Sequence, residues 1–201
     1  MTRRLATVGL LAVALLIPAS LRAQDAPRLI DEIRTHEGDA AVWWTGHNGW
    51  LIKSGDLLVG TDLVLEYPGR LEPSPISAME LAPELDVAFI THGHGDHFGR
   101  RTVRILLEHS DCIFVIPAST VDIAEELGIP TERLVIAEPR TSFSVRRVQV
   151  DAIRAIHGDQ LSAVYIEANL LDCGYLITLD GTSRHDGVRR GQPLLGEGIP
   201  I

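Results

Sequence analysis

The sequence predicts an α/β fold, because apolar runs typical of strands alternate with amphipathic stretches typical of helices. Residues 85–90 (LDVAFI) are apolar and rich in branched and aromatic side chains, which indicates a buried strand. In residues 100–109, apolar side chains recur among charged ones, which indicates a helix. The 201-residue chain is 45% hydrophobic and 22% charged, as expected of one globular domain with a substantial core.

The other elements follow along the chain from the same kinds of pattern. A helix is predicted at Leu29–Thr35, and a proline-containing loop with a short helix is predicted at residues 67–83. Strands are predicted near residues 40–44, 49–53 and 56–61. After the helix at 100–109, the pattern predicts a strand at 112–117, a helix at 119–127, a strand at 133–137, and a bent strand or hairpin at 142–156.

Three histidines and an aspartate gather in residues 91–99 (THGHGDHFG), directly after the buried strand. The end of such a strand is where open α/β sheets usually bind ligands. In an extended loop, His92 and His94 project to the same side and can hold one metal ion, while the glycines avoid crowding it. Asp96 and His97 can address a second position as the chain turns into the helix. Imidazole and carboxylate together suit zinc or a similar first-row divalent ion.

The H-x-H-x-D-H pattern of residues 92–97, followed by Gly99, resembles the signature of the metallo-β-lactamase superfamily. Three flanking segments resemble the branch that contains ascorbate-6-phosphate lactonase-like proteins: residues 42–53 (VWWTGHNGWLIK), 57–62 (LLVGTD) and 169–181 (NLLDCGYLITLDG). We interpret residues 38–182 as a metallo-β-lactamase-like domain. The resemblance implies a four-layer αββα sandwich, in which two sheets pack face to face, helices lie outside, and metals bind at one edge.

The resemblance also implies a role for each ligand. His92 and His94 would hold the first metal ion together with His157, which follows the predicted strand or hairpin at 142–156. Asp96 and His97 would serve a second ion. Asp96 is also the implied catalytic group, which orients the nucleophile and carries a proton. The expected cofactor is zinc, as one or two ions, with manganese or iron as alternatives.

Two further residues are expected beside the metals. Members of the family that this chain resembles often have a histidine at the position of His47, near the metals but not usually bound to them. A contact to substrate or to a ligand is one interpretation, and a structural hydrogen bond across the turn is the other. Asp62 ends the predicted strand at 56–61 and is expected to belong to the groups that support the ligands.

The chemistry that such a site implies is hydrolysis. A zinc-type ion lowers the pKa of bound water to roughly 7, so a metal-bound hydroxide would be available at neutral pH. The substrate would be a small molecule with an ester, lactone, amide or phosphodiester bond. A catalytically impaired metal-binding scaffold of the same fold is the alternative. Iron oxidoreductases of this fold carry a glutamate where this chain has His94, which argues against that class.

The last part of the sequence departs from the family pattern. The family has a strand that ends in Gly-Asp-Thr or Gly-Asp-Ser, and its aspartate bridges both metals. Residues 181–190 (GTSRHDGVRR) lack this order, and Asp186 is the nearest carboxylate and the remaining candidate ligand. We expect an irregular tail at 183–201 in place of the C-terminal strands, and therefore an incomplete second half of the sandwich.

Residues 1–23 have the three parts of a secretory signal peptide: a basic start, an apolar core and a small residue at the cleavage position. We expect export to the periplasm or medium of a bacterium, without stable membrane insertion after cleavage. Cleavage would remove three arginines and no acid, so the formal net charge of −9 would become −12. Such a chain repels polyanions, which argues against nucleic acid as a partner.

Two cysteines, Cys112 and Cys173, each precede an apolar strand. In an oxidising compartment they could form one disulfide, and two buried free thiols are the favoured alternative. Cys173 is also a weak candidate for a metal ligand, because thiolates bind zinc.

Overall fold

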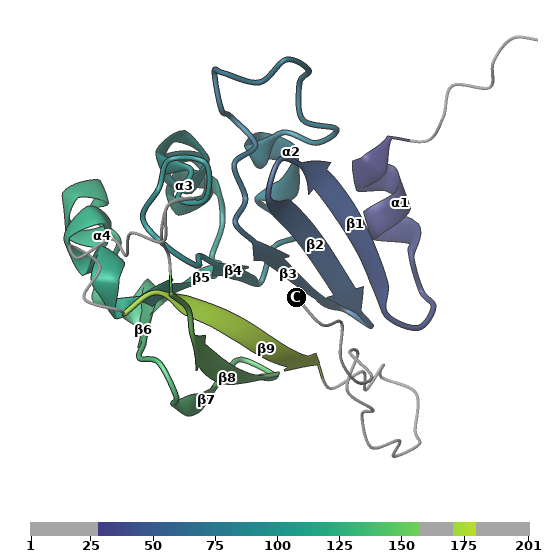
Figure 1. Ribbon diagram of the computed structural model, residues 1–201. Coiled ribbons are helices and arrows are strands. Elements are labelled where there is room, and N and C mark those ends of the chain that lie inside the picture. Colours follow the sequence, from purple (N-terminus) through teal and green to yellow (C-terminus); the bar gives the residue numbers. More distant parts are fainter. Residues whose placement is uncertain (1–27, 157–170, 180–201) are drawn as a thin grey trace, which may run out of the picture.

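The computed structural model describes residues 28–156 and 171–179 of the chain (Figure 1). The predicted signal peptide at 1–23, the tail at 183–201, and the candidate ligands His157 and Asp186 lie outside the described residues. Within the described ranges, none of the helices has the length and apolar character needed to cross a membrane.

A six-stranded sheet forms the centre of the described chain, with its strands in the order β1-β2-β3-β4-β5-β6. The strands are β1 (Ala41–Gly46), β2 (Gly49–Ser54), β3 (Leu57–Thr61), β4 (Val87–Phe89), β5 (Ile113–Pro117) and β6 (Leu134–Ala137). The pairs β1-β2 and β2-β3 are antiparallel, whereas the pairs from β3 to β6 are parallel. Thr61 lies opposite Phe89, so the carboxyl ends of β3 and β4 meet at one edge of the sheet.

Helices cover one face of this sheet (Figure 1). They are α1 (Leu29–Thr35), α2 (Ala78–Leu81), α3 (Arg100–His109) and α4 (Val121–Leu127), with short 3-10 turns at Ala118–Thr120 and Thr131–Arg133. In α2, the Ser77 hydroxyl accepts from the backbone N–H of Glu80, and the Glu80 carboxylate accepts from the backbone N–H of Ser77. This reciprocal capping explains how a helix of four residues is held in place after a proline-rich loop.

The opposite face of the central sheet packs against a second sheet of three antiparallel strands. These are β7 (Ser142–Val145), β8 (Val148–Arg154) and β9 (Cys173–Leu179), in that order across the sheet. The segment at 142–156 is therefore a hairpin followed by two further residues, which settles the choice between a hairpin and a bent strand. Alternate residues of β8 are buried and exposed, so its outward side chains face solvent.

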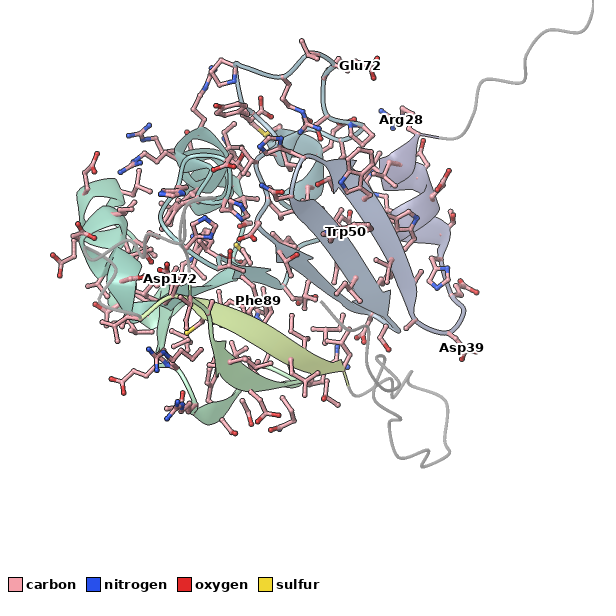
Figure 2. The ribbon with its side chains drawn as sticks, in the orientation of Figure 1. Arg28, Asp39, Trp50, Glu72, Phe89 and Asp172 are labelled. Atoms are coloured by element: carbon pink, nitrogen blue, oxygen red, sulfur yellow. The ribbon has the colours of Figure 1, made fainter. Side chains whose placement is uncertain are left out.

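β3 shows how one strand serves both cores. Leu58 belongs to the core under the helices, whereas Leu57 and Val59 belong to the core between the sheets. Phe89, at the end of β4, lies between the two sheets and contacts Tyr175 of β9 (Figure 2). Fully burying one such apolar side chain contributes roughly 1.5–3 kcal/mol, so these central strands hold the layers together from both faces.

The mixed α/β class is confirmed, with two sheets packed face to face and helices on the outer face of the central sheet. The predicted helices at Leu29–Thr35 and Arg100–His109 have the bounds that the sequence pattern indicated. The described residues build three of the four expected layers: the helices, the central sheet and the second sheet. Among the described residues, no helix covers the outer face of the second sheet.

The two cysteines lie on opposite faces of the central sheet. Cys112 belongs to the core under the helices, and Cys173 belongs to the core between the sheets. Both are buried free thiols, so the disulfide alternative is wrong for this structure.

Candidate metal centre

The histidine-rich loop leaves the carboxyl end of β4 and enters α3. The expectation of an extended loop is wrong, because the chain bends after His92 and forms a turn. The backbone N–H groups of His97 and Phe98 both donate to the carbonyl oxygen of His94, at 2.9 and 2.7 Å. As a result, His92 is buried at 8% exposure while His94 faces solvent.

The turn nevertheless gathers the imidazoles. The ring centres of His92 and His94 are 5.0 Å apart, and those of His92 and His97 are 3.9 Å apart. The Asp96 carboxylate lies beside them, with its Oδ2 atom 3.8 Å from Nε2 of His97. Among the described residues, no three His, Cys, Asp or Glu side chains are arranged so that they alone could hold one metal ion. The predicted third ligand of the first site, His157, lies outside those residues.

Asp62 holds the histidine-rich loop through hydrogen bonds. It follows β3, and its carboxylate accepts from the backbone N–H of Thr91 at 2.9 Å and from the Thr91 hydroxyl at 2.8 Å. It also accepts from Nδ1 of His97 at 2.8 Å. Asp62 is only 6% exposed and has a φ of 45°, a conformation that non-glycine residues adopt at an energetic cost. Three hydrogen bonds to one loop offset that cost.

This network fixes which nitrogen of each ring carries the proton. The Nδ1 atom of His97 faces a carboxylate, which can only accept, so the proton lies on Nδ1. The Thr91 hydroxyl donates its hydrogen to Asp62. Its oxygen therefore accepts from Nδ1 of His92 at 3.0 Å. Both rings then carry their lone pairs on Nε2, which is the state a metal-binding imidazole needs. The donor set therefore fits a zinc-type ion in its chemistry.

Asn48, in the turn between β1 and β2, contacts the imidazole of His97. Its side-chain nitrogen donates to the carbonyl oxygen of Asp96 at 3.2 Å and lies 2.9 Å from Nε2 of His97. A donor at this position agrees with a lone pair on Nε2. Asn48 thus occupies the direction from which an ion would bind His97.

Electrostatics favour a positive charge at His97. Burial alone would lower the pKa of its imidazole, but the hydrogen bond that it donates to Asp62, the charge of Asp62 and the charge of Asp96 outweigh burial. The net effect raises the pKa of His97 above its ordinary value of 6.5. The same acidic surroundings that stabilise a protonated ring also favour a cation bound beside it.

His47 lies at the same edge, in the turn between β1 and β2. Its Nε2 atom is 3.8 Å from Oδ2 of Asp96, and its ring stacks on Tyr67 with centres 5.8 Å apart. The φ of His47 is 57°, another unfavourable backbone angle at this edge. His47 therefore lies beside Asp96 at this edge. Among the described residues, its ring makes no hydrogen bond across its own turn.

The second sheet closes the other side of the loop. The backbone N–H of Cys173 donates to the carbonyl oxygen of Thr91 at 3.2 Å, and the Tyr175 hydroxyl donates to the carbonyl oxygen of Ile90 at 2.8 Å. Ala155, just after β8, donates to the carbonyl oxygen of Asp172 at 3.0 Å. Through Asp172 and Cys173, the end of β8 is therefore linked to the edge that carries the histidine loop.

Gly99 makes the exit from the loop possible. A Cβ atom at this position would lie 2.8 Å from the carbonyl oxygen of Leu63 and 3.1 Å from Cα of Val64. Both are backbone atoms, which cannot move aside cheaply. The small residue after the histidine motif is thus required by the close approach of the chain that follows Asp62.

Sequence reasoning did not identify Thr91, Asn48 or Tyr67 as parts of this centre. Thr91 and Asn48 are adjacent in the sequence to His92 and His47, which the sequence pattern did indicate. Their partners, however, depend on how three separate loops meet, which no local pattern records. Tyr67 had no signal beyond its place at the start of a predicted loop.

A family model described as "Beta-lactamase superfamily domain" matches residues 60–185. An uncharacterized protein of Mycobacterium tuberculosis is 29% identical over 144 residues, which cover 66% of this chain and 38% of the relative. A probable L-ascorbate-6-phosphate lactonase of Salmonella paratyphi B is 22% identical over 176 residues, which cover 73% of this chain and 49% of the relative. The chain thus spans less than half the length of these curated relatives.

Solved structures with the same fold include enzymes of different chemistry. A metallo hydrolase from Ignicoccus hospitalis has a TM-score of 0.50 at 16% identity, with 70% of this chain and 56% of that chain covered. A diiron beta-hydroxylase from Streptomyces venezuelae has a TM-score of 0.53 at 21% identity, with 73% of this chain and 28% of that chain covered. At such identities the likeness establishes the fold alone.

Proposed function

Because the chain belongs to the beta-lactamase superfamily, we propose that it is a metal-dependent hydrolase that uses a zinc-type ion on a small molecule. One observation carries the proposal: buried Asp62 holds the imidazole of His97 directly and that of His92 through Thr91. Carboxylates and hydroxyls that orient the far nitrogen of a histidine are the usual support beneath metal-binding imidazoles.

On this proposal, His92 and His94 hold one ion together with His157, and Asp96 and His97 serve a second. When bound, a zinc-type ion lowers the pKa of a water molecule to about 7 and polarises the bond under attack. A small ester, lactone, amide or phosphodiester is the expected substrate class.

The protein's own side chains divide the remaining work. Asp96 has a half-exposed carboxylate at the mouth of the site, where it can orient the nucleophile and accept its proton. His47 lies 3.8 Å from that carboxylate, at the same edge. The support of Asp62 and Thr91 keeps the two imidazoles in one tautomer through the reaction.

Hydrolysis is favoured over iron-dependent oxidation by the residue at position 94. Iron oxidoreductases of this fold have a glutamate there, whereas this chain has an imidazole. A scaffold that binds metal without catalysis is the remaining alternative, and activity measurements separate it from a hydrolase.

The test is metal content and turnover of the full chain after removal of metal and reconstitution with zinc, manganese or iron. We expect tight binding of zinc and metal-dependent hydrolysis of at least one ester, lactone, amide or phosphodiester in a broad panel. The double variant His92→Ala/His94→Ala should lose both, and His109→Ala, on the surface of α3, should lose neither. Equal metal content in wild type and the double variant would overturn the assignment. Metal binding without any turnover would support the scaffold.

A further inference from the structure

We propose that an open cavity beside the metal centre binds the aromatic or alkyl part of a neutral ester or lactone, in preference to a phosphorylated sugar. The cavity lies between the β1–β2 turn and the loop at residues 67–75. This inference rests on the proposed function, because it names the substrate class of the same site.

The cavity has a volume of about 920 Å³, within the range of small-molecule sites. Its described lining is mainly aromatic and apolar, with a few polar groups: Trp44, Gly46, His47, Tyr67, Gly69, Arg70, Leu71, Glu72, Pro73 and Pro75. Glu72 marks the outer end of the loop that forms its roof (Figure 2). A flat or branched apolar group of a small substrate fits this space.

Three aromatic rings form a wall whose positions are fixed before a ligand arrives. The indole nitrogen of Trp44 donates to the carbonyl oxygen of His47 at 2.9 Å. The His47 ring in turn stacks on Tyr67, with an angle of 23° between the ring planes. Because the rings are already ordered, a ligand that packs on them loses less free energy to ordering the site.

The wall exposes apolar surface that nothing in the described chain covers. Trp44 is 58% exposed, Tyr67 is 39% exposed, and Leu71 is fully exposed. Each square ångström of such surface that a ligand removes from water contributes about 25 cal/mol. Exposed apolar groups gathered around a cavity beside a candidate active site are typical of a ligand-binding surface.

The charges of the cavity argue against a phosphate group. Arg70 is the one arginine or lysine in the described lining, and each of its three nitrogens donates to a backbone carbonyl oxygen: that of Thr45, Val64 or Glu72. The acid Glu72 lies in the same lining, and the whole chain carries a formal net charge of −9. A dianion entering here would meet a guanidinium already used to brace the loop, in an acidic protein.

His47 connects this cavity to the metal centre. It lines the cavity, and its Nε2 atom is 3.8 Å from Oδ2 of Asp96. A substrate packed on Trp44 and Tyr67 therefore directs its reactive end toward Asp96 and the histidine loop.

The test measures binding of β-tetralone to the full chain after metal has been removed. This probe has the fused rings and carbonyl of the aryl lactone dihydrocoumarin but no bond that can be hydrolysed. We expect saturable quenching of tryptophan fluorescence by β-tetralone and none by glucose-6-phosphate at the same concentrations. Saturable binding of the sugar phosphate alone would overturn the proposal.

Matched variants locate the site. Trp44→Ala should weaken β-tetralone binding at least about tenfold, a loss of about 1.4 kcal/mol. Trp44→Phe should retain binding, measured by calorimetry, while losing most of the fluorescence change. Trp50→Ala is the control, because Trp50 is the cross-strand partner of Trp44, is 45% exposed and does not line the cavity. Leu71→Ser replaces a fully exposed side chain, so it should leave the protein folded. It should weaken the binding of β-tetralone several-fold.

The two proposals can fail separately. Binding of β-tetralone at Trp44 with no hydrolysis of any panel substrate would uphold the cavity and contradict the hydrolase. Efficient hydrolysis of a phosphorylated sugar lactone, unaffected by Trp44→Ala, would uphold the hydrolase and contradict the cavity.

Discussion

The residues that orient the histidine loop and the aromatic residues that line the cavity are held in place in different ways. Asp62 and Thr91 are held by hydrogen bonds of 2.8 to 2.9 Å at the end of the central sheet, and Asp62 is almost fully buried. Trp44 and Tyr67 are exposed and are held by one hydrogen bond and one ring stack. The difference indicates that the orientation of the imidazoles depends on the edge of the central sheet, whereas the proposed substrate cavity depends on a loop that can vary without disturbing that edge. Variants in the two regions should therefore affect different measurements.

The largest effect is expected at Asp62. Asp62→Asn keeps the shape of the side chain but removes the charge that orients His97 and Thr91, so zinc affinity should fall by about 10–100-fold. The measurement is competition for zinc with a chelator of known affinity. Asp39→Asn, an exposed acid at the far end of β1 (Figure 2), should change affinity less than twofold. If both variants lower zinc affinity equally, then net charge controls zinc binding, rather than the orientation of His97 and Thr91.

A smaller effect of opposite sign is expected at Asn48, which links the two regions. Its side chain bonds Nε2 of His97, the nitrogen that an ion must reach. A net hydrogen bond is worth about 0.5–1.5 kcal/mol, so Asn48→Ala should raise the zinc affinity of the second site by roughly 2–10-fold. Calorimetric titration of both ions measures this change, with Trp50→Ala on the same hairpin as the control. A weaker second site in Asn48→Ala would show that Asn48 supports the ion instead of competing with it.

The smallest effect is expected at Cys173. Its backbone contacts the histidine loop, but burial and the nearby charge of Asp172 raise the pKa of its thiol to about 11. The thiol therefore stays protonated at neutral pH and becomes a thiolate only as the pH approaches that value. Cys173→Ala should leave zinc affinity within twofold, and the folded wild type should resist alkylation at pH 8 until denaturant is added. Rapid alkylation that zinc prevents would make Cys173 a ligand.

Much of the fold could be predicted because local patterns determined it. The helix at Arg100–His109 combines an apolar stripe with a charged face, and β4 is an apolar run that both cores bury. The hairpin at 142–154 was ambiguous, because its turn at Arg146 has no glycine although its φ is 50°. The extended conformation expected at His92 and His94 was wrong, because the chain already bends at residues 93–94, before the hydrogen bonds to the carbonyl oxygen of His94 close a turn.

The candidate site could be predicted only in part, for a physical reason. The ligand types are concentrated in one short segment, so their chemistry is visible in the sequence. Asp62 was expected to support the ligands, but its partners were not visible, because Asp62, Thr91 and Asn48 come from three connections that meet only when the strands of the central sheet pair. His157 and Asp186 lie outside the described residues, so their assignment as ligands stays a prediction.

The central claim is that both His92 and His97 carry their proton on Nδ1 and offer Nε2 to an ion. Nitrogen NMR of the imidazoles in the metal-free protein tests this directly, at a pH high enough to overcome the raised pKa of His97. We expect the Nδ1–H tautomer for both rings, and a large shift of both Nε2 signals on addition of zinc. An Nε2–H tautomer in either ring, or Nε2 signals that zinc does not move, would contradict the account.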